Sequence, residues 1–178
     1  MKNICVFCGS AKGNGETYLN LAREIGEKMV DLNYGLVYGG ASIGVMGQIA
    51  DSVLEKNGSV IGVMPKSLVN WEVEHKNLTK FEMVDSMHER KQKMYDYSDI
   101  FLAIPGGMGT LDELCEIVTW AQLQYHRKPI YLLNHEGFFT HLINHLEHAV
   151  KEGFLKPHHM KLIKVVDSAE DFFEDLKI

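Results

Sequence analysis

Residues 99–116 read DIFLAIPGGMGTLDELCE, and this stretch predicts a strand, a glycine turn and a helix in succession. Residues 100–104 form a short apolar run with the length of a buried strand. Residues 105–109 contain three glycines, and from Thr110 onward apolar residues recur at helical spacing. A strand that leads through a glycine loop into a helix is typical of α/β proteins.

The same geometry favours an anion site. The N-terminus of a helix presents amide donors and the positive end of a dipole, and glycine lets an anion approach the backbone closely. Glu113 and Glu116 follow on one helix face, which suggests chemistry on a phosphorylated substrate. An alternative stays open, because Thr110-x-x-Glu113 also fits a capping box that serves only its own helix.

Composition narrows the class of protein. A chain of 178 residues predicts one domain, 1–178, large enough to bury a core. A net charge of -6 with scattered Lys and Arg argues against a nucleic-acid partner. Signal-peptide features and an apolar run of membrane-span length are both missing, so no membrane partner is expected. Three cysteines argue against a disulfide framework, and we expect a cytoplasmic protein.

Strands and helices are predicted to alternate along the chain. The expected strands are 3–8, 34–38, 60–64, 81–84, 100–104, 129–133 and 163–166. The expected helices are 16–33, 47–56, 86–98, 110–124, 138–152 and 168–177, while 66–79 reads as a loop or short helix. Alternation of this kind predicts a doubly wound, mostly parallel, Rossmann-like α/β sheet with helices on both faces.

Three glycine loops, 9–15, 39–47 and 106–109, directly follow predicted strands. In such sheets ligands bind beyond the carboxyl ends of the strands, so the loops should form one nucleotide-sized crevice. Neither a dinucleotide G-x-G-x-x-G at the right spacing nor a P-loop lysine motif occurs. The pattern therefore favours a monophosphate site without an obligatory metal.

Residues 87–91 read MHERK and open a polar helix that Ser86-x-x-Glu89 predicts to be capped. Arg90 should lie near the ligand edge of the sheet, where its fork of donors suits phosphate or a developing oxyanion. The alternative is that 89–93 is simply a solvated charged face.

The segment PGGMGTLDE (105–113) has every fixed position of PGGxGTxxE, and the chain thereby resembles the LOG family, the cytokinin-activating phosphoribohydrolases long labelled lysine decarboxylases. MHERK is similar to the companion Arg–Lys helix of that family. Residues 39–47 and 119–134 also resemble it, so the resemblance covers nearly the whole chain.

This resemblance implies hydrolysis of the N-glycosidic bond of AMP or an N6-modified adenosine 5′-monophosphate, without a cofactor and in a homodimer. It implies that Arg90 and Glu113 are the catalytic pair. A carboxylate near C1′ can stabilise oxocarbenium charge, attack it or activate water. The implied substrate-binding residues, to which we add Glu116 for its place on the helix, are Glu72, Arg90, Lys91, Gly107, Met108, Gly109, Thr110, Leu111, Asp112, Glu113 and Thr119.

Two other functions are considered. A non-catalytic nucleotide carrier or sensor on the same fold would not need an acid paired with an arginine. A decarboxylase would need a pyridoxal-phosphate lysine, and nothing in the sequence marks one.

Several other residues are considered for the site. Cys5-x-x-Cys8 lies inside a predicted strand, where a redox role is not expected. Three histidines, His141, His145 and His148, share one face of a predicted helix and are expected to border its apolar side rather than to bind a metal. Trp71 is a candidate to stack on a base, and the role of His88 is open.

Overall fold

The computed structural model describes residues 1–69 and 73–177. Seven strands form one sheet in the order β4-β3-β2-β1-β5-β6-β7, and every neighbouring pair is parallel. The predicted doubly wound α/β fold is therefore confirmed. The strands are β1 (Lys2–Phe7), β2 (Tyr34–Tyr38), β3 (Val60–Pro65), β4 (Lys80–Val84), β5 (Ile100–Ala103), β6 (Ile130–Leu133) and β7 (Ile163–Val166).

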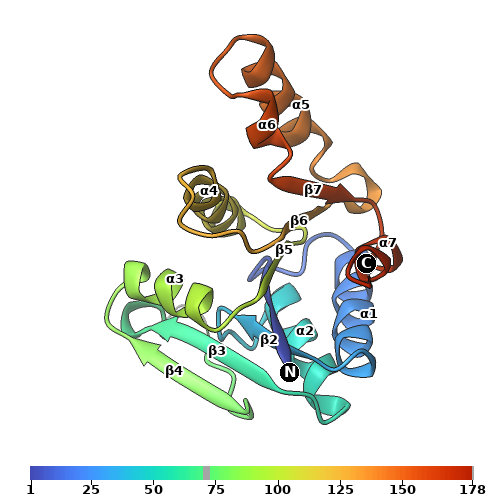
Figure 1. Cartoon of the computed structure of the whole chain (residues 1–178). Coiled ribbons are helices and arrows are strands. Elements are labelled where there is room, and N and C mark those ends of the chain that lie inside the picture. Colours follow the sequence, from blue (N-terminus) through green and yellow to red (C-terminus); the bar gives the residue numbers. More distant parts are fainter. Residues whose placement is uncertain (70–72, 178) are drawn as a thin grey trace.

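Helices connect the strands and cover both faces of the sheet (Figure 1). They are α1 (Thr17–Asp31), α2 (Gly44–Glu55), α3 (Met87–Asp96), α4 (Met108–Gln122), α5 (Thr140–Lys151), α6 (Pro157–Met160) and α7 (Ala169–Asp175). Two short 3-10 turns, Lys66–Leu68 and His135–Gly137, complete the regular structure of the described residues.

Two helices begin earlier than the sequence predicts. Helix α2 starts at Gly44 and α4 at Met108, because Ile43 and Gly107 adopt the extended conformation of an N-cap. The last residues of both glycine loops therefore belong to helices. This shift changes the position of Thr110, which lies within the first turn of α4 and not at its cap.

Alternation along β1 divides the core into two layers. Ile4 and Val6 pack with α1, α2 and α7 on one face of the sheet, while Cys5 and Phe7 pack with α4 and the start of α5 on the other. All four side chains are buried, as expected for a central parallel strand covered on both faces.

The strand order reverses at β1. The chain runs outward from β1 to β4 and then returns through α3 to β5, which pairs with the other side of β1. A reversal of this kind leaves a crevice at the carboxyl ends of the two strands, because the connections leave them in opposite directions. The first and third glycine loops follow these two strands directly.

Helices α5 and α6 project beyond the edge strand β7 (Figure 1). No residue of α5 is buried, although Leu142, Leu146 and Val150 lie on one side of it and are half-buried. None of the helices in the described part of the chain is long and apolar enough to span a bilayer.

Candidate active site

The three glycine loops meet as predicted. Gly9, Gly39 and Gly107, one from each loop, line a single hollow of about 180 Å³. Backbone bonds join the loops: Gly9 N donates to Pro105 O at 3.3 Å, and Met46 N donates to Gly9 O at 3.1 Å. The remaining lining residues are Val6, Cys8, Ser10, Met46, Arg90, Met108, Gly109, Thr110 and Glu113.

Arg90 is 6% exposed, so the reading of its segment as a solvated face is wrong for this residue. Its Nε donates to Val63 O at 3.1 Å, and one terminal nitrogen donates to Gly39 O at 3.4 Å. Two main-chain carbonyls therefore orient the guanidinium, and its other terminal nitrogen remains to face the hollow.

The capping box predicted for α3 forms only in part. Ser86 Oγ accepts from the amide of Glu89 at 3.1 Å, as expected for the N-cap. The Glu89 carboxylate, however, accepts from the amide of Asp85 at 2.9 Å and not from that of Ser86. The start of α3 is still fixed by two bonds, one residue before Arg90.

Glu113 lies opposite Arg90. The closest nitrogen and oxygen of the pair are 3.7 Å apart, and the Glu113 side chain is only 10% exposed. The two side chains come from different helices, α3 and α4, and both line the hollow. A carboxylate and a guanidinium are thus held together where the glycine loops converge.

The capping-box interpretation of Thr110 and Glu113 is wrong. Helix α4 begins at Met108 with Gly107 as its N-cap, so Thr110 is the third helical residue. The Thr110 hydroxyl is buried and has no hydrogen-bond partner among the described residues. A buried hydroxyl without a partner is costly, so no contact among the described residues explains why a threonine occupies this position.

The N-termini of α2 and α4 differ. The first turn of α2 is closed by the first glycine loop, because Val45 N donates to Ala11 O and Met46 N to Gly9 O. In α4, Leu111 N donates to Gly107 O, whereas the preceding helical amides donate to no atom of the described residues. An anion at this edge of the sheet would therefore find its donors at α4.

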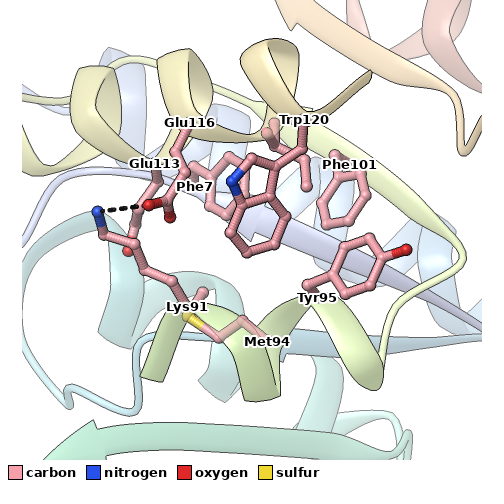
Figure 2. A pocket seen from close by; sticks show the side chains of 9 residues that line it. Phe7, Lys91, Met94, Tyr95, Phe101, Glu113, Glu116 and Trp120 are labelled. Atoms are coloured by element: carbon pink, nitrogen blue, oxygen red, sulfur yellow. Dashed lines mark ion pairs between the residues drawn. The ribbon is translucent and has the colours of Figure 1, made fainter. Parts of the chain in front are cut away.

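The Lys91 ammonium contacts two carboxylates of α4 other than that of Glu113. Its ammonium lies 2.9 Å from Asp112 and 3.4 Å from Glu116, and the second pair is drawn in Figure 2. Burial lowers the pKa of Lys91, but the hydrogen bond to Asp112 and the two carboxylate charges outweigh it and raise the pKa overall. Lys91 is therefore a fixed cation that ties α3 to α4.

An aromatic slot lies next to this cation (Figure 2). The rings of Trp120 and Tyr95 meet edge to face at 5.5 Å, and Phe7 and Phe101 stack behind them. The slot measures about 10 Å³, which leaves room for about one water and no base. In this arrangement Trp120 serves as packing between α3 and α4.

Only some of the other predicted site residues that the structure describes line the hollow. Met108, Gly107 and Gly109 line the hollow, and Met108 is 80% exposed. Leu111 is half-buried against the core. Thr119 lies outside the hollow: its hydroxyl donates to Cys115 O at 2.7 Å, and it borders an apolar pocket between α4, α5 and α6. Glu72 and Trp71 fall outside the described residues.

Six lining residues were not among the predicted site residues, namely Val6, Cys8, Gly9, Ser10, Gly39 and Met46. The available signal was the first glycine loop, which was expected at this edge and which contains Ser10. Ser10 is exposed at the mouth of the hollow, where a hydroxyl can donate to an anion.

Of the features discounted from the sequence, Cys8 lines the hollow, whereas Cys5 and the histidines do not. Burial, the largest cause, raises the pKa of the Cys5 thiol well above its usual value, so it is not an activated thiolate. All three histidines of α5 are exposed, as is His88. Among the described residues, no group of three or more His, Cys, Asp or Glu side chains is placed to hold a metal ion.

Comparison with known proteins identifies the family. Residues 46–176 match the family described as "Possible lysine decarboxylase". The chain is 45% identical to the cytokinin riboside 5'-monophosphate phosphoribohydrolase LOG1 of Arabidopsis thaliana, over 99% of this chain and 83% of that protein. The chain belongs to the LOG family. The LOG protein of rice is 44% identical over 96% of this chain and 70% of its own length.

Solved structures of other proteins share this fold. The molybdenum cofactor carrier protein of Chlamydomonas reinhardtii has a TM-score of 0.73 at 20% identity and covers 99% of this chain and 96% of its own. The molybdenum cofactor binding protein of Rippkaea orientalis gives the same values. At this level of identity the likeness shows the fold alone.

Proposed function

We propose that this LOG-family chain hydrolyses the N-glycosidic bond of AMP or of N6-modified adenosine 5′-monophosphates, giving the free base and ribose 5-phosphate. The observation that carries the proposal is the Arg90–Glu113 pair, which faces the same hollow as the N-terminus of α4, whose first amides have no acceptor among the described residues. An acid and an anion site are thus one helical turn apart. The relatives named as phosphoribohydrolases support the same reaction.

The phosphate is assigned to the start of α4. The amides of its first turn and the buried Thr110 hydroxyl supply donors, and the helix dipole favours a negative guest. Ser10 faces the same hollow from the first loop. Binding of the remote phosphate would hold the ribose in place for reaction, which is how binding energy assists a step at a different atom.

Glu113 is assigned to the anomeric carbon. Cleavage of the C1′–N9 bond builds oxocarbenium character on the ribose, and a nearby carboxylate stabilises or attacks that carbon or activates water. An arginine guanidinium is too weak an acid to serve as a proton donor, so Arg90 is not given that role. Its place beside Glu113 suits it to hold the carboxylate and the ribose hydroxyls.

The test is incubation of the purified chain with AMP and with N6-isopentenyl-AMP, followed by chromatography of the products. Wild type should release free base, and Glu113→Gln should release at least about 100-fold less, which is the usual contribution of a positioned acid–base group. Glu55→Gln is the matched control, because it makes the same chemical change on the exposed end of α2, away from the hollow, and should leave the rate unchanged.

The outcomes separate the candidate functions. Release of base by the wild type and not by Glu113→Gln supports the hydrolase. Equal activity in both variants contradicts the role of Glu113. If both nucleotides bind and neither is cleaved, the chain is a carrier or sensor, and the hydrolase proposal is overturned.

A homodimer is proposed from the apolar surface around α5. Leu142 and Leu146 of α5, together with Val118 of α4, line an open apolar pocket of about 170 Å³. An amphipathic helix with no buried residue suits contact with a second copy. Sedimentation should give twice the monomer mass, and a monomeric mass at micromolar concentration would contradict it. A cytoplasmic location stays a prediction from the cysteine content.

A further inference from the structure

Residues 73–77, called here the strap, are tied to the second glycine loop. Ala41 and Glu74 form an isolated antiparallel bridge. Ser42 reinforces it, since both its amide and its hydroxyl donate to Val73 O, at 2.7 and 2.9 Å. The strap is therefore held along the loop that follows β2, on the far side of that loop from α4.

His75 is the most buried described side chain of the strap, at 7% exposed. Its amide donates to Gly40 O at 3.0 Å, and its Nε2 lies 2.9 Å from the carboxylate of Asp51 on α2. Its Nδ1 accepts from the amide of Asn77 at 3.3 Å. Because Nδ1 is an acceptor, the proton of the neutral ring is on Nε2, which donates to Asp51.

The carbonyl that His75 holds is next in the chain to the one that orients Arg90. Gly40 has a φ of +85°, a conformation that favours glycine, so the loop turns sharply between its two contacts. Gly40 O accepts from the strap, and the preceding carbonyl, Gly39 O, accepts from Arg90. A Cβ at Gly39 would lie 2.0 Å from a guanidinium nitrogen, which shows how closely Arg90 rests on this backbone.

We propose that His75 is a positioning residue: by joining the strap to α2 and to Gly40, it fixes the Gly39–Gly40 turn against which the Arg90 guanidinium is oriented. The proposal rests on the function proposed above, since Arg90 is the residue whose orientation His75 would control. His75 is not among the residues that line the hollow, so it would act on catalysis only through Arg90. Misplacement of a reacting group by about 1 Å costs up to about 100-fold in rate.

His75→Ala and His75→Gln test the role. His75→Ala removes both ring bonds and should lower kcat at least about tenfold, with a smaller change in KM, because phosphate donors on α4 are untouched. In His75→Gln the amide nitrogen can still donate to Asp51, so kcat should recover in part. Thr79→Val is the control. It removes the hydroxyl that accepts from Val60 N, two residues after the strap, and should leave kcat unchanged.

A double-mutant cycle of His75 and Arg90 distinguishes the positioning role from a purely structural one. In an Arg90→Lys background, whose guanidinium is already gone, His75→Ala should lower kcat less than about twofold. The four proteins of this cycle are also unfolded in urea, where the two substitutions should be non-additive. Failure of wild type to cleave either nucleotide overturns the proposed function, and the urea cycle then still tests the link between His75 and Arg90. Lower stability with an unchanged kcat, or strictly additive effects, overturns the inference.

Discussion

Replacement of Thr110 by valine tests the anion site, because the free energy of unfolding should rise if the hydroxyl is unsatisfied and fall if it caps the helix. The hydroxyl is buried and has no hydrogen-bond partner among the described residues. Valine has nearly the same shape and needs no partner, so it relieves the cost of an unsatisfied polar atom, which is about 1–3 kcal/mol. We therefore expect Thr110→Val to be more stable than the wild type by ~1 kcal/mol. A helix-capping threonine would instead lose about 1 kcal/mol.

The assay is urea unfolding without ligand and with ribose 5-phosphate, which contains no bond for the enzyme to cleave. At a ligand concentration 100 times the wild-type Kd, binding stabilises the wild type by about 2.7 kcal/mol. If the hydroxyl contacts the phosphate and its loss raises Kd about tenfold, Thr110→Val gains only about 1.4 kcal/mol from the same ligand. The variant should thus be more stable alone and less stabilised by ligand.

Thr79→Val is the matched control for this experiment. The Thr79 hydroxyl accepts from the amide of Val60 at 3.0 Å, so the same substitution there should cost about 1 kcal/mol and leave ligand binding unchanged. The reasoning is refuted if Thr110→Val is destabilised like the control, or if ribose 5-phosphate stabilises it as much as it does the wild type.

Three further expectations concern other parts of the chain. Arg90→Ala should cost about 3–5 kcal/mol in urea unfolding, because it removes the buried guanidinium that faces the Glu113 carboxylate. Arg90→Ala with Glu113→Gln should cost less than the sum, and additive losses would contradict the pairing. Gly106→Ala places a Cβ 2.1 Å from the buried threonine hydroxyl, so it should cost about 1–3 kcal/mol and weaken AMP binding in calorimetry. The pKa of Glu82 is lowered to about 2, chiefly by the Tyr97 hydroxyl, so its stabilisation is present above about pH 4.5 and is lost as the pH falls toward 2. Glu82→Gln should cost ~1 kcal/mol at pH 7, after allowance for solvent screening, and should flatten the acid limb of an unfolding-versus-pH series.

The sheet and the meeting of the loops were predictable because they follow from local patterns. A buried strand such as 100–104 is an apolar run, and each glycine loop directly follows such a run. Right-handed parallel crossovers then require the loops to share one edge. The exact start of α4 was not predictable, since it depends on Gly107 adopting an extended conformation, which glycine tolerates as readily as the alternatives. The loss of the capping box follows from that single choice.

The choice between the two glycine-rich helix starts could not be made from sequence, because it depends on contacts between distant loops. Both α2 and α4 begin just after a glycine-rich loop, and each alone would be an anion site. The first loop supplies Gly9 O and Ala11 O to the amides of α2 and so occupies that helix terminus. Among the described residues, three first-turn amides of α4 (residues 108–110) have no acceptor, against one in α2, that of Gly44, and α4 is also the helix that carries Glu113. The first loop thus occupies most of the α2 terminus and leaves the start of α4 as the better candidate for an anion, one helical turn before Glu113.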